Sequence, residues 1–229
     1  MIRLTDEDVL RVRKNFEEYI KLYGHLYSEE TIEYIIDSFL DESFDMDMYA
    51  DILHQVYSLT GAYDNIENFY DCCIEDMKEI YDIENGHLLD VGCGIMPAFA
   101  KRVSDRQVNG SVTGMDPSVI VTELGKVKVF KENFTMNTDV SKYDLVYGIL
   151  SCDATLTMIK RANACDKDLY IQLCGCTHFE FSNPFMVQPL GMWYDYVQSV
   201  MESTIPANRK YEMYLPSYME YPVLRTKKK

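Results

Sequence analysis

Apolar residues recur three or four positions apart along the first 86 residues of the chain. This spacing is typical of amphipathic helices, which turn one apolar face toward a core. Glycines close three of the four runs, as expected where a helix ends. The pattern predicts no strand in this region. The predicted helices run from Thr5 to Gly24, from Ser28 to about Phe39, from about Met46 to Leu59, and from about Asn65 to Ile83.

From His87 onward the period changes, and short apolar runs alternate with helical stretches. Alternating strands and helices indicate an α/β fold with a mostly parallel sheet. Two further apolar runs, YEMYL and YPVLRT, come after the last predicted helix and predict a closing antiparallel pair. The predicted strands are HLLDV, SVTGMD, KVKVF, YDLVYGIL and DLYIQLC; the predicted helical segments are PAFAKRVSD, a turn from Pro117, DATLTMIKRANA, and Trp193 to Met201.

Composition and charge narrow the class of protein. At 229 residues and 47% hydrophobic, the chain can bury a full core. The formal net charge is -15, and residues 1 to 80 hold twenty Asp and Glu against six Lys and Arg. An acidic front half repels a phosphate backbone, so the charge argues against nucleic-acid binding. We also expect no membrane span and, because the N-terminus lacks a signal-peptide pattern, a cytoplasmic location.

Seven cysteines include no C-x-x-C pair, so a structural zinc site is not predicted. Cys93, Cys152, Cys174 and Cys176 follow the ends of predicted strands and are expected at one edge of the sheet. They could bind a soft metal or metalloid, or supply a nucleophile. The simpler interpretation is small apolar side chains packed in the interior. We predict no metal ligands.

The stretch LLDVGCGIMPAFAKRV, residues 88 to 103, is the most informative part of the chain. A strand that leads through glycines into a helix is a ligand-binding device, because glycine permits a tight turn and the helix start offers unpaired amides. The next strand ends in Asp116, 24 residues after Gly92. An acidic side chain there can accept hydrogen bonds from both hydroxyls of a ribose. The turn and the acid together predict a nucleoside ligand.

Two nucleoside cofactors make different demands on this turn. A nicotinamide dinucleotide needs close backbone approach along G-x-G-x-x-G, whereas Pro97 stands here at the third glycine. DVGCG followed by GMDPS instead resembles motif one and the second-strand motif of the class I S-adenosylmethionine-dependent methyltransferases. YDLVYGIL is similar to the fourth-strand motif of that family, and DLYIQLCG falls where its fifth strand should lie. The resemblance covers roughly residues 65 to 200.

The resemblance implies a Rossmann-like, mostly parallel sheet and an S-adenosylmethionine site. Gly92, Cys93 and Gly94 would pack against the methionine portion, and Asp116 would hold the ribose. One departure is Met96-Pro97, where the fuller family pattern has a third glycine at Met96; a proline suits the first turn of a helix, so the turn can survive. The implied cofactor-binding residues are Asp90, Gly92, Cys93, Gly94, Asp116, Glu132 and Asn133 near the adenine, and Gly148 and Ser151 on the methionine side.

Methyl transfer needs a general base only when the acceptor arrives protonated. Asp153, after the fourth strand of the family pattern, and His178, after the fifth, are the catalytic candidates because both follow strand ends at the edge that carries the glycine turn. Asp153 could equally cap the helix that follows it, and His178 could be an ordinary loop residue.

The acceptor is the least readable part of the sequence. The family's N-P-P-Y or D-P-P-Y signature for amines of nucleic-acid bases does not follow the fourth strand, where this chain has GILSCDAT. With the acidic charge, this favours a small-molecule acceptor. We predict an N-terminal helical lid subdomain over residues 1–64, followed by a Rossmann-like methyltransferase domain over 65–229. The sequence is also compatible with a homo-oligomer. Two alternative functions stay open: a non-catalytic S-adenosylmethionine-binding module whose helical half docks a partner protein, and thiol-assisted metalloid methylation on the same scaffold.

Overall fold

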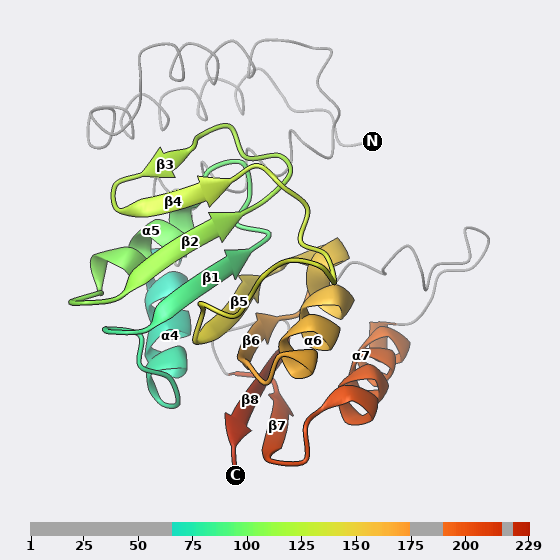
Figure 1. Ribbon diagram of the computed structural model, residues 1–229. Helices are drawn as coiled ribbons and strands as arrows, with labels where there is room; N and C mark the ends of the chain where they lie inside the picture. Colours follow the sequence, from blue (N-terminus) through green and yellow to red (C-terminus); the bar gives the residue numbers. More distant parts are fainter. Residues whose placement is uncertain (1–65, 175–189, 217–221) are drawn as a thin grey trace, which may run out of the picture.

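The computed structural model describes residues 66–174, 190–216 and 222–229, and within them the chain forms an eight-stranded sheet with helices on both faces (Figure 1). The predicted helices before residue 65, and with them the lid subdomain, lie outside the described residues. In chain order the elements are α4 Ile66–Lys78, β1 His87–Val91, α5 Ala98–Asp105, β2 Ser111–Met115, β3 Glu123–Leu124, β4 Val127–Phe130, β5 Leu145–Ile149, the 3-10 helix η2 Cys152–Ala154, α6 Thr155–Ala164, β6 Asp168–Gln172, α7 Leu190–Thr204, β7 Arg209–Tyr214 and β8 Val223–Lys228.

The central strands are short, apolar and buried along most of their length, as expected when helices cover both faces of a parallel sheet. The strand order is β3-β4-β2-β1-β5-β6-β8-β7. β4, β2, β1, β5 and β6 are parallel neighbours. The chain winds outward from β1 toward β4 and then returns to β5 on the other side of β1. The prediction of a mostly parallel α/β sheet is confirmed, and its topological switch point lies between β1 and β5.

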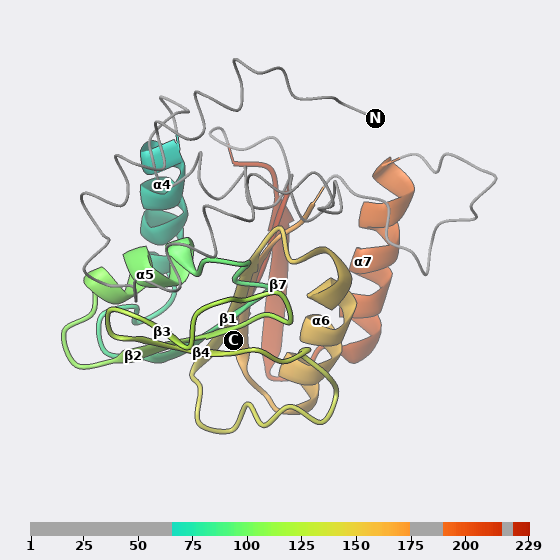
Figure 2. The ribbon, with the colours of Figure 1, turned by 90° about the horizontal axis from the view of Figure 1, so that it is seen from above.

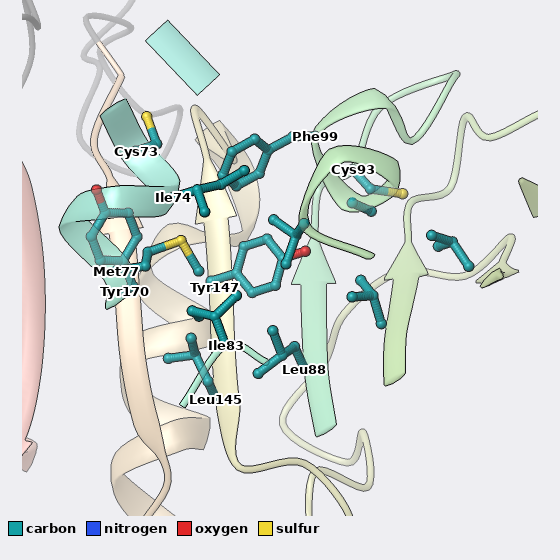
Figure 3. Close-up of a cluster of buried hydrophobic side chains, with 14 of the residues drawn as sticks. Cys73, Ile74, Met77, Ile83, Leu88, Cys93, Phe99, Leu145, Tyr147 and Tyr170 are labelled. Carbon is teal, nitrogen blue, oxygen red and sulfur yellow. The ribbon is translucent and has the colours of Figure 1, made fainter. Parts of the chain in front are cut away.

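Two helical layers cover the two faces of the sheet. α4 and α5 lie on one face, and α6 and α7 lie on the other (Figure 2). Side chains alternate between these layers along each strand, so Leu88 belongs to the core under α4 and α5 while Leu89 belongs to the core under α6 and α7. In Figure 3, Ile74 and Met77 of α4 and Phe99 of α5 lie over Tyr147 and Tyr170 of the sheet.

The predicted antiparallel pair at the C-terminal end is also confirmed. β7 pairs with β8, and β8 pairs antiparallel with β6. Arg225 of β8 reaches across to α4, where its Nη1 donates to Asp76 Oδ1 at 2.8 Å. The same Asp76 accepts hydrogen bonds from the hydroxyls of Tyr170 and Tyr214. The closing strands are therefore held to α4 by a partly buried polar network.

One predicted segment differs from the structure. The helix expected to reach Ile83 ends at Lys78, because Tyr81 turns inward and its buried hydroxyl lies 2.8 and 2.7 Å from the carbonyl oxygens of Leu169 and Thr226. The helical turn predicted from Pro117 is a single hydrogen-bonded turn, in which the N–H of Ser118 donates to Asp116 Oδ1 at 2.7 Å and the N–H of Val119 donates to the carbonyl oxygen of Asp116 at 3.4 Å. The short strand β3 that follows was not predicted.

Candidate functional site

The glycine turn directly follows β1 at the switch point of the sheet. Gly92 and Gly94 have φ values of +70° and +77°, in the left-handed region that favours glycine. The N–H of Gly92 donates to the carbonyl oxygen of Met115 at 2.8 Å, which ties the turn to the end of β2. A Cβ at Gly92 would lie 3.0 Å from Ser151 Cβ. The first glycine is therefore required both by backbone conformation and by close packing.

Asp116 connects the end of β2 to this turn. Its Oδ2 accepts a hydrogen bond from the N–H of Gly94 at 2.9 Å, and its Oδ1 accepts the bond from Ser118. The side chain is half-buried. Because each carboxylate oxygen has two lone pairs, one on each oxygen remains available for a ligand donor. The predicted acid thus lies against the predicted turn, and it can still accept hydrogen bonds from a ribose.

Asp90 lies in the last part of β1, beneath the turn, and is only 2% exposed. Burial raises the pKa of its carboxyl well above the usual value, and the nearby Asp116 carboxylate raises it further, while the N–H of Ala100 favours the charged form. Ala100 lies in the first turn of α5, where amides lack helical partners. Asp90 therefore contributes to the start of α5, for which Pro97 provides no side-chain cap.

The end of β5 packs tightly against the turn from the other side. The hydroxyl of Ser151 donates to the carbonyl oxygen of Val91 at 2.5 Å. A Cβ at Gly148 would lie 2.1 Å from Ser151 Oγ, so glycine at this position makes room for the serine. Between them, Leu150 has φ +57°, a strained conformation for a leucine. Such strain concentrates at functional sites, and here it sits at the edge of the switch point.

The other predicted site residues are distributed along the same edge. Glu132 and Asn133 are exposed and follow the end of β4. Asp153 is exposed within η2, after β5. The N-cap of α6 is Ala154, so the alternative interpretation of Asp153 as the cap of that helix is wrong. His178 lies outside the described residues.

The cysteines divide in a way that favours packing. Cys93 and Cys174 are buried, and Cys152 is half-buried with its thiol 3.3 Å from the carbonyl oxygen of Leu150. Cys176 lies outside the described ranges. Within those ranges, no group of three or more His, Cys, Asp and Glu side chains could hold a metal ion. Burial raises the pKa of the Cys93 thiol, and the nearby Asp90 raises this pKa further.

Two features of this edge were not predicted. Tyr147, on β5, is the register partner of Asp90 on β1, and its hydroxyl is fully buried. Phe130, the last residue of β4, is 39% exposed next to Asp116, whose N–H donates to its carbonyl oxygen at 3.1 Å. Tyr147 depends on strand register, which the sequence pattern does not specify. The sequence does carry a signal for Phe130, because an aromatic residue at the carboxyl end of the predicted strand KVKVF is expected at the ligand-binding edge.

The sequence matches no protein-family model, and a comparison with curated proteins found no match. The fold is similar to a ribosomal protein L11 methylase from Lactobacillus delbrueckii subsp. bulgaricus, at 12% identity over 70% of this chain and 77% of that chain, with a TM-score of 0.49. It is also similar to a magnesium protoporphyrin IX methyltransferase from Synechocystis with bound SAH, at 10% identity over 79% and 92% of the two chains and a TM-score of 0.46.

A third similar structure is MtNAS in complex with S-adenosylmethionine, at 10% identity over 97% of this chain and 78% of that chain, with a TM-score of 0.48. The chain thus matches several S-adenosylmethionine-dependent methyltransferases in structure at low sequence identity. Because these TM-scores are all below 0.5, the Rossmann-like fold is inferred from the strand order and the turn geometry of the chain itself. None of the helices in the described residues is long and apolar enough to cross a membrane.

Proposed function

We propose that this protein binds S-adenosylmethionine at the carboxyl edge of β1, β2 and β4 and transfers its methyl group to a small-molecule acceptor. One observation carries the proposal: of the two left-handed glycines at the switch point, Gly94 donates its N–H to the carboxylate of Asp116, which directly follows the next strand. A bend without side chains and an acid with free lone pairs suit the two ends of one nucleoside cofactor.

The described residues fit this cofactor. Gly92, Cys93 and Gly94 would face its methionine portion with backbone atoms, since the Cys93 side chain points toward the space left by Gly114, whose added Cβ would lie 2.9 Å from Cys93 Sγ. Asp116 would accept hydrogen bonds from the ribose hydroxyls. Glu132 and Asn133 follow the strand next to β2 and would lie toward the adenine, together with the exposed ring of Phe130.

Asp90, Gly148 and Ser151 would act from below the cofactor rather than by direct contact. The Ser151 hydroxyl already donates to Val91, and Gly148 leaves the space that this hydroxyl fills. Together they hold the end of β5 against the glycine turn. We propose that these residues position the turn on the methionine side.

When bound, S-adenosylmethionine would supply a methyl group on a positively charged sulfur. The acceptor would attack this methyl carbon in line with the carbon–sulfur bond, and the neutral thioether would leave. The chain's own contribution is to hold the acceptor in near-attack geometry and to exclude water. A protonated acceptor would need a base, and Asp153, exposed in η2 after β5, is the proposed residue for this role. His178 stays a prediction for the same role.

The acceptor is proposed to be a small molecule. The support is the net charge of -15 and the stretch GILSCDAT in place of a base-methylating signature. The proposed lid subdomain, residues 1–64, would cover the site. Neither nucleic acid nor a membrane surface is a proposed partner, and the proposed location is cytoplasmic.

Replacement of Asp116 tests the cofactor site. We expect Asp116→Ala to weaken S-adenosylmethionine binding by about 2 kcal/mol, roughly thirtyfold, the scale of losing charge-assisted hydrogen bonds. Isothermal titration calorimetry measures this change. Asp139→Ala is the matched control. Asp139 makes a turn of the same kind, in which its Oδ1 accepts the N–H of the residue two positions later, Ser141, at 2.9 Å, and this turn lies away from the proposed site. Equal affinity in Asp116→Ala and the wild type would contradict the proposal.

Catalysis needs a second experiment. Purified protein would be incubated with S-adenosylmethionine and a broad panel of small amines, hydroxyls and thiols, and the formation of S-adenosylhomocysteine would be followed. Turnover with one class of acceptor supports the proposed reaction. Binding without turnover across the whole panel would favour a cofactor-binding module that docks a partner protein.

A further inference from the structure

Two buried polar side chains under the glycine turn are incompletely satisfied. Asp90 on β1 and Tyr147 on β5 are register partners on neighbouring parallel strands, so both point to the face covered by α5. Asp90 Oδ2 and the Tyr147 hydroxyl have no hydrogen-bond partner among the described residues. Buried polar atoms without partners are rare in folded proteins, and each one calls for a physical explanation.

The surroundings of this pair are apolar or negatively charged. The ring of Phe99 from α5 packs edge-on against the ring of Tyr147, with centroids 5.7 Å apart (Figure 3). Asp116, which follows β2, raises the pKa of Asp90, and Asp90 in turn raises the pKa of the buried Cys93 thiol in the turn. The pair is thus enclosed by a thiol, a carboxylate and an aromatic ring.

The cations on α5 are committed elsewhere. Lys101 bonds Asp105 one turn further along the helix, at 2.6 Å. Arg102 forms a bidentate pair with Asp71 of α4, with distances of 2.9 and 2.8 Å. On α4, the titratable side chain in the same core cluster as Tyr147 is the buried thiol of Cys73, whose pKa is raised by burial and by Asp76. In the described part of the protein, the charges near Asp90 are therefore negative.

A negative charge on Asp90 is consequently unfavourable in the free protein. Burial and the Asp116 carboxylate both raise the pKa of Asp90, so its carboxyl retains a proton at pH values where an exposed aspartate has lost it. A cation bound at the turn would reverse this preference, since an opposite charge within a few ångströms favours the ionised form. The released proton would pass to bulk water.

We propose that Asp90 and Tyr147 form a proton-linked site that releases a proton when a sulfonium group lies at the glycine turn, and so favours the sulfonium cofactor over its neutral thioether product. This inference rests on the proposed function. S-adenosylmethionine and S-adenosylhomocysteine share the adenosine and the amino-acid group, and they differ by one methyl group and one positive charge. Any pH dependence that belongs to their shared groups cancels in the ratio of their affinities.

Calorimetry of the two ligands tests this inference. Both would be titrated into the wild type between pH 6 and 9 (about the range where a raised carboxyl pKa is visible), in pairs of buffers with different ionisation enthalpies. We expect proton release with S-adenosylmethionine and little with S-adenosylhomocysteine. The affinity ratio should rise with pH, by up to about tenfold per unit where one proton is released. Equal proton release for both ligands would overturn the inference.

Two variants localise the proton. Asp90→Asn keeps the shape of the side chain and removes its titration, so the affinity ratio should become independent of pH. Tyr147→Phe keeps the carboxyl and removes the adjacent hydroxyl, so the pH dependence should persist with a displaced midpoint. If the affinity ratio depends on pH in Asp90→Asn as it does in the wild type, Asp90 is excluded as the proton donor. If either variant fails to fold, the wild-type measurement still tests the inference.

The two proposals fail in different ways. If neither ligand binds at about millimolar concentration, the proposed function is wrong and this inference falls with it. If both ligands bind with the same pH dependence, the cofactor site stands and only the proton linkage is excluded. Circular dichroism of each variant establishes that a lost signal is not a lost fold.

Discussion

Two clusters of polar side chains lie on the same face and in the same row of the sheet, one partly buried and one fully buried, and they are partnered very differently. The register runs from Asp90 to Tyr147, then to Tyr170 and Arg225. At the β6–β8 end, Arg225 and the Tyr170 hydroxyl both bond Asp76 of α4, at 2.8 and 2.9 Å. At the β1–β5 end, Asp90 Oδ2 and the Tyr147 hydroxyl find no such partner in the described ranges.

The difference separates stability from function. A buried polar network in which the members bond one another fixes a unique arrangement of the elements, here α4 against the closing strands. A buried pair that is left incomplete costs free energy, and natural proteins keep such features mainly where function requires them. The incomplete pair lies directly below the glycine turn, where the proposed cofactor would bind.

The largest expected effect is at the satisfied cluster. Asp76→Ala leaves the Arg225 guanidinium, whose side chain is 13% exposed, without its main carboxylate, and removes the acceptor of two tyrosine hydroxyls. We expect the free energy of unfolding to fall by about 3 kcal/mol. Urea denaturation measures this loss.

Glu79→Gln is the control for this substitution. Glu79 also pairs with Arg225, at 3.3 Å, but its side chain is 65% exposed. An exposed ion pair contributes at most about 1 kcal/mol, so the control should unfold close to the wild type. Similar losses in the two variants would show that the network is not held by Asp76.

The next effect distinguishes the glycine turn from an ordinary turn. Gly92 and Gly125 have φ values of +70° and +62°, so an alanine at either position is strained by about 1 to 2 kcal/mol. At Gly125 the nearest atoms belong to the flexible Lys101 side chain. Chemical denaturation should therefore show this loss in both variants, and a larger loss in Gly92→Ala, where the new Cβ also meets the buried Ser151.

Only Gly92→Ala should also lose cofactor affinity, because its new Cβ would press against Ser151 at the edge of the proposed site. Calorimetry with S-adenosylmethionine measures this difference. Unchanged binding in Gly92→Ala, with the protein folded, would mean that the turn does not approach the cofactor.

The third effect has the opposite sign and concerns the incomplete cluster. The folded-state pKa of Asp90 is raised by burial and by Asp116. Its contribution to stability is therefore fully present below the unfolded pKa and is lost as pH rises through the folded pKa. Asp90→Asn has no buried negative charge at high pH, and its amide oxygen can still accept the N–H of Ala100. We expect the variant to be more stable than the wild type at pH 8, by about 1 kcal/mol.

The measurement is urea denaturation at pH 5 and pH 8 (about one and four units above an ordinary aspartate pKa). The advantage of Asp90→Asn should be larger at the higher pH. An advantage that does not grow with pH would show that the carboxyl is charged throughout this range.

The sequence pattern predicted the strands and the turn because their causes are local. A buried apolar run such as HLLDV needs no other part of the chain to be read as a strand, and two glycines before a helix indicate a turn by themselves. The proximity of Asp116 to Gly94 followed from a general rule, that parallel strands end at the same edge. The strands and the turn are set by residues close together in the chain, and the general rule adds which strand ends meet.

The missed features depend on contacts between distant residues. Tyr147 lies beside Asp90 only because β1 and β5 pair in one register, and shifting either strand by one residue would turn its side chain to the opposite face. The early end of α4 depends on Tyr81, whose hydroxyl meets carbonyl groups 88 and 145 residues away. Neither pairing has a signal in the local pattern.

The smallest effect concerns the ion pairs that join the two helices above both clusters. Asp71 of α4 accepts hydrogen bonds from Arg102 and Arg106, each at 2.8 Å. The hydrogen bond from Arg102 is the main cause that lowers the pKa of Asp71, although partial burial opposes it. Because the side chain is 35% exposed, solvent screens the pair, and we expect Asp71→Asn to lose only about 0.5 kcal/mol at neutral pH.

The pH dependence of this loss identifies its origin. A carboxyl with a lowered folded-state pKa stabilises the protein above its unfolded pKa, and this stability is lost as pH falls through the folded pKa. The difference between Asp71→Asn and the wild type should therefore shrink when denaturation is repeated at progressively lower pH below the ordinary value of about 3.9. Asp105→Asn removes a comparable but more exposed pair with Lys101 and should change less. A loss in Asp71→Asn that is the same at every pH would assign its role to packing between α4 and α5 rather than to charge.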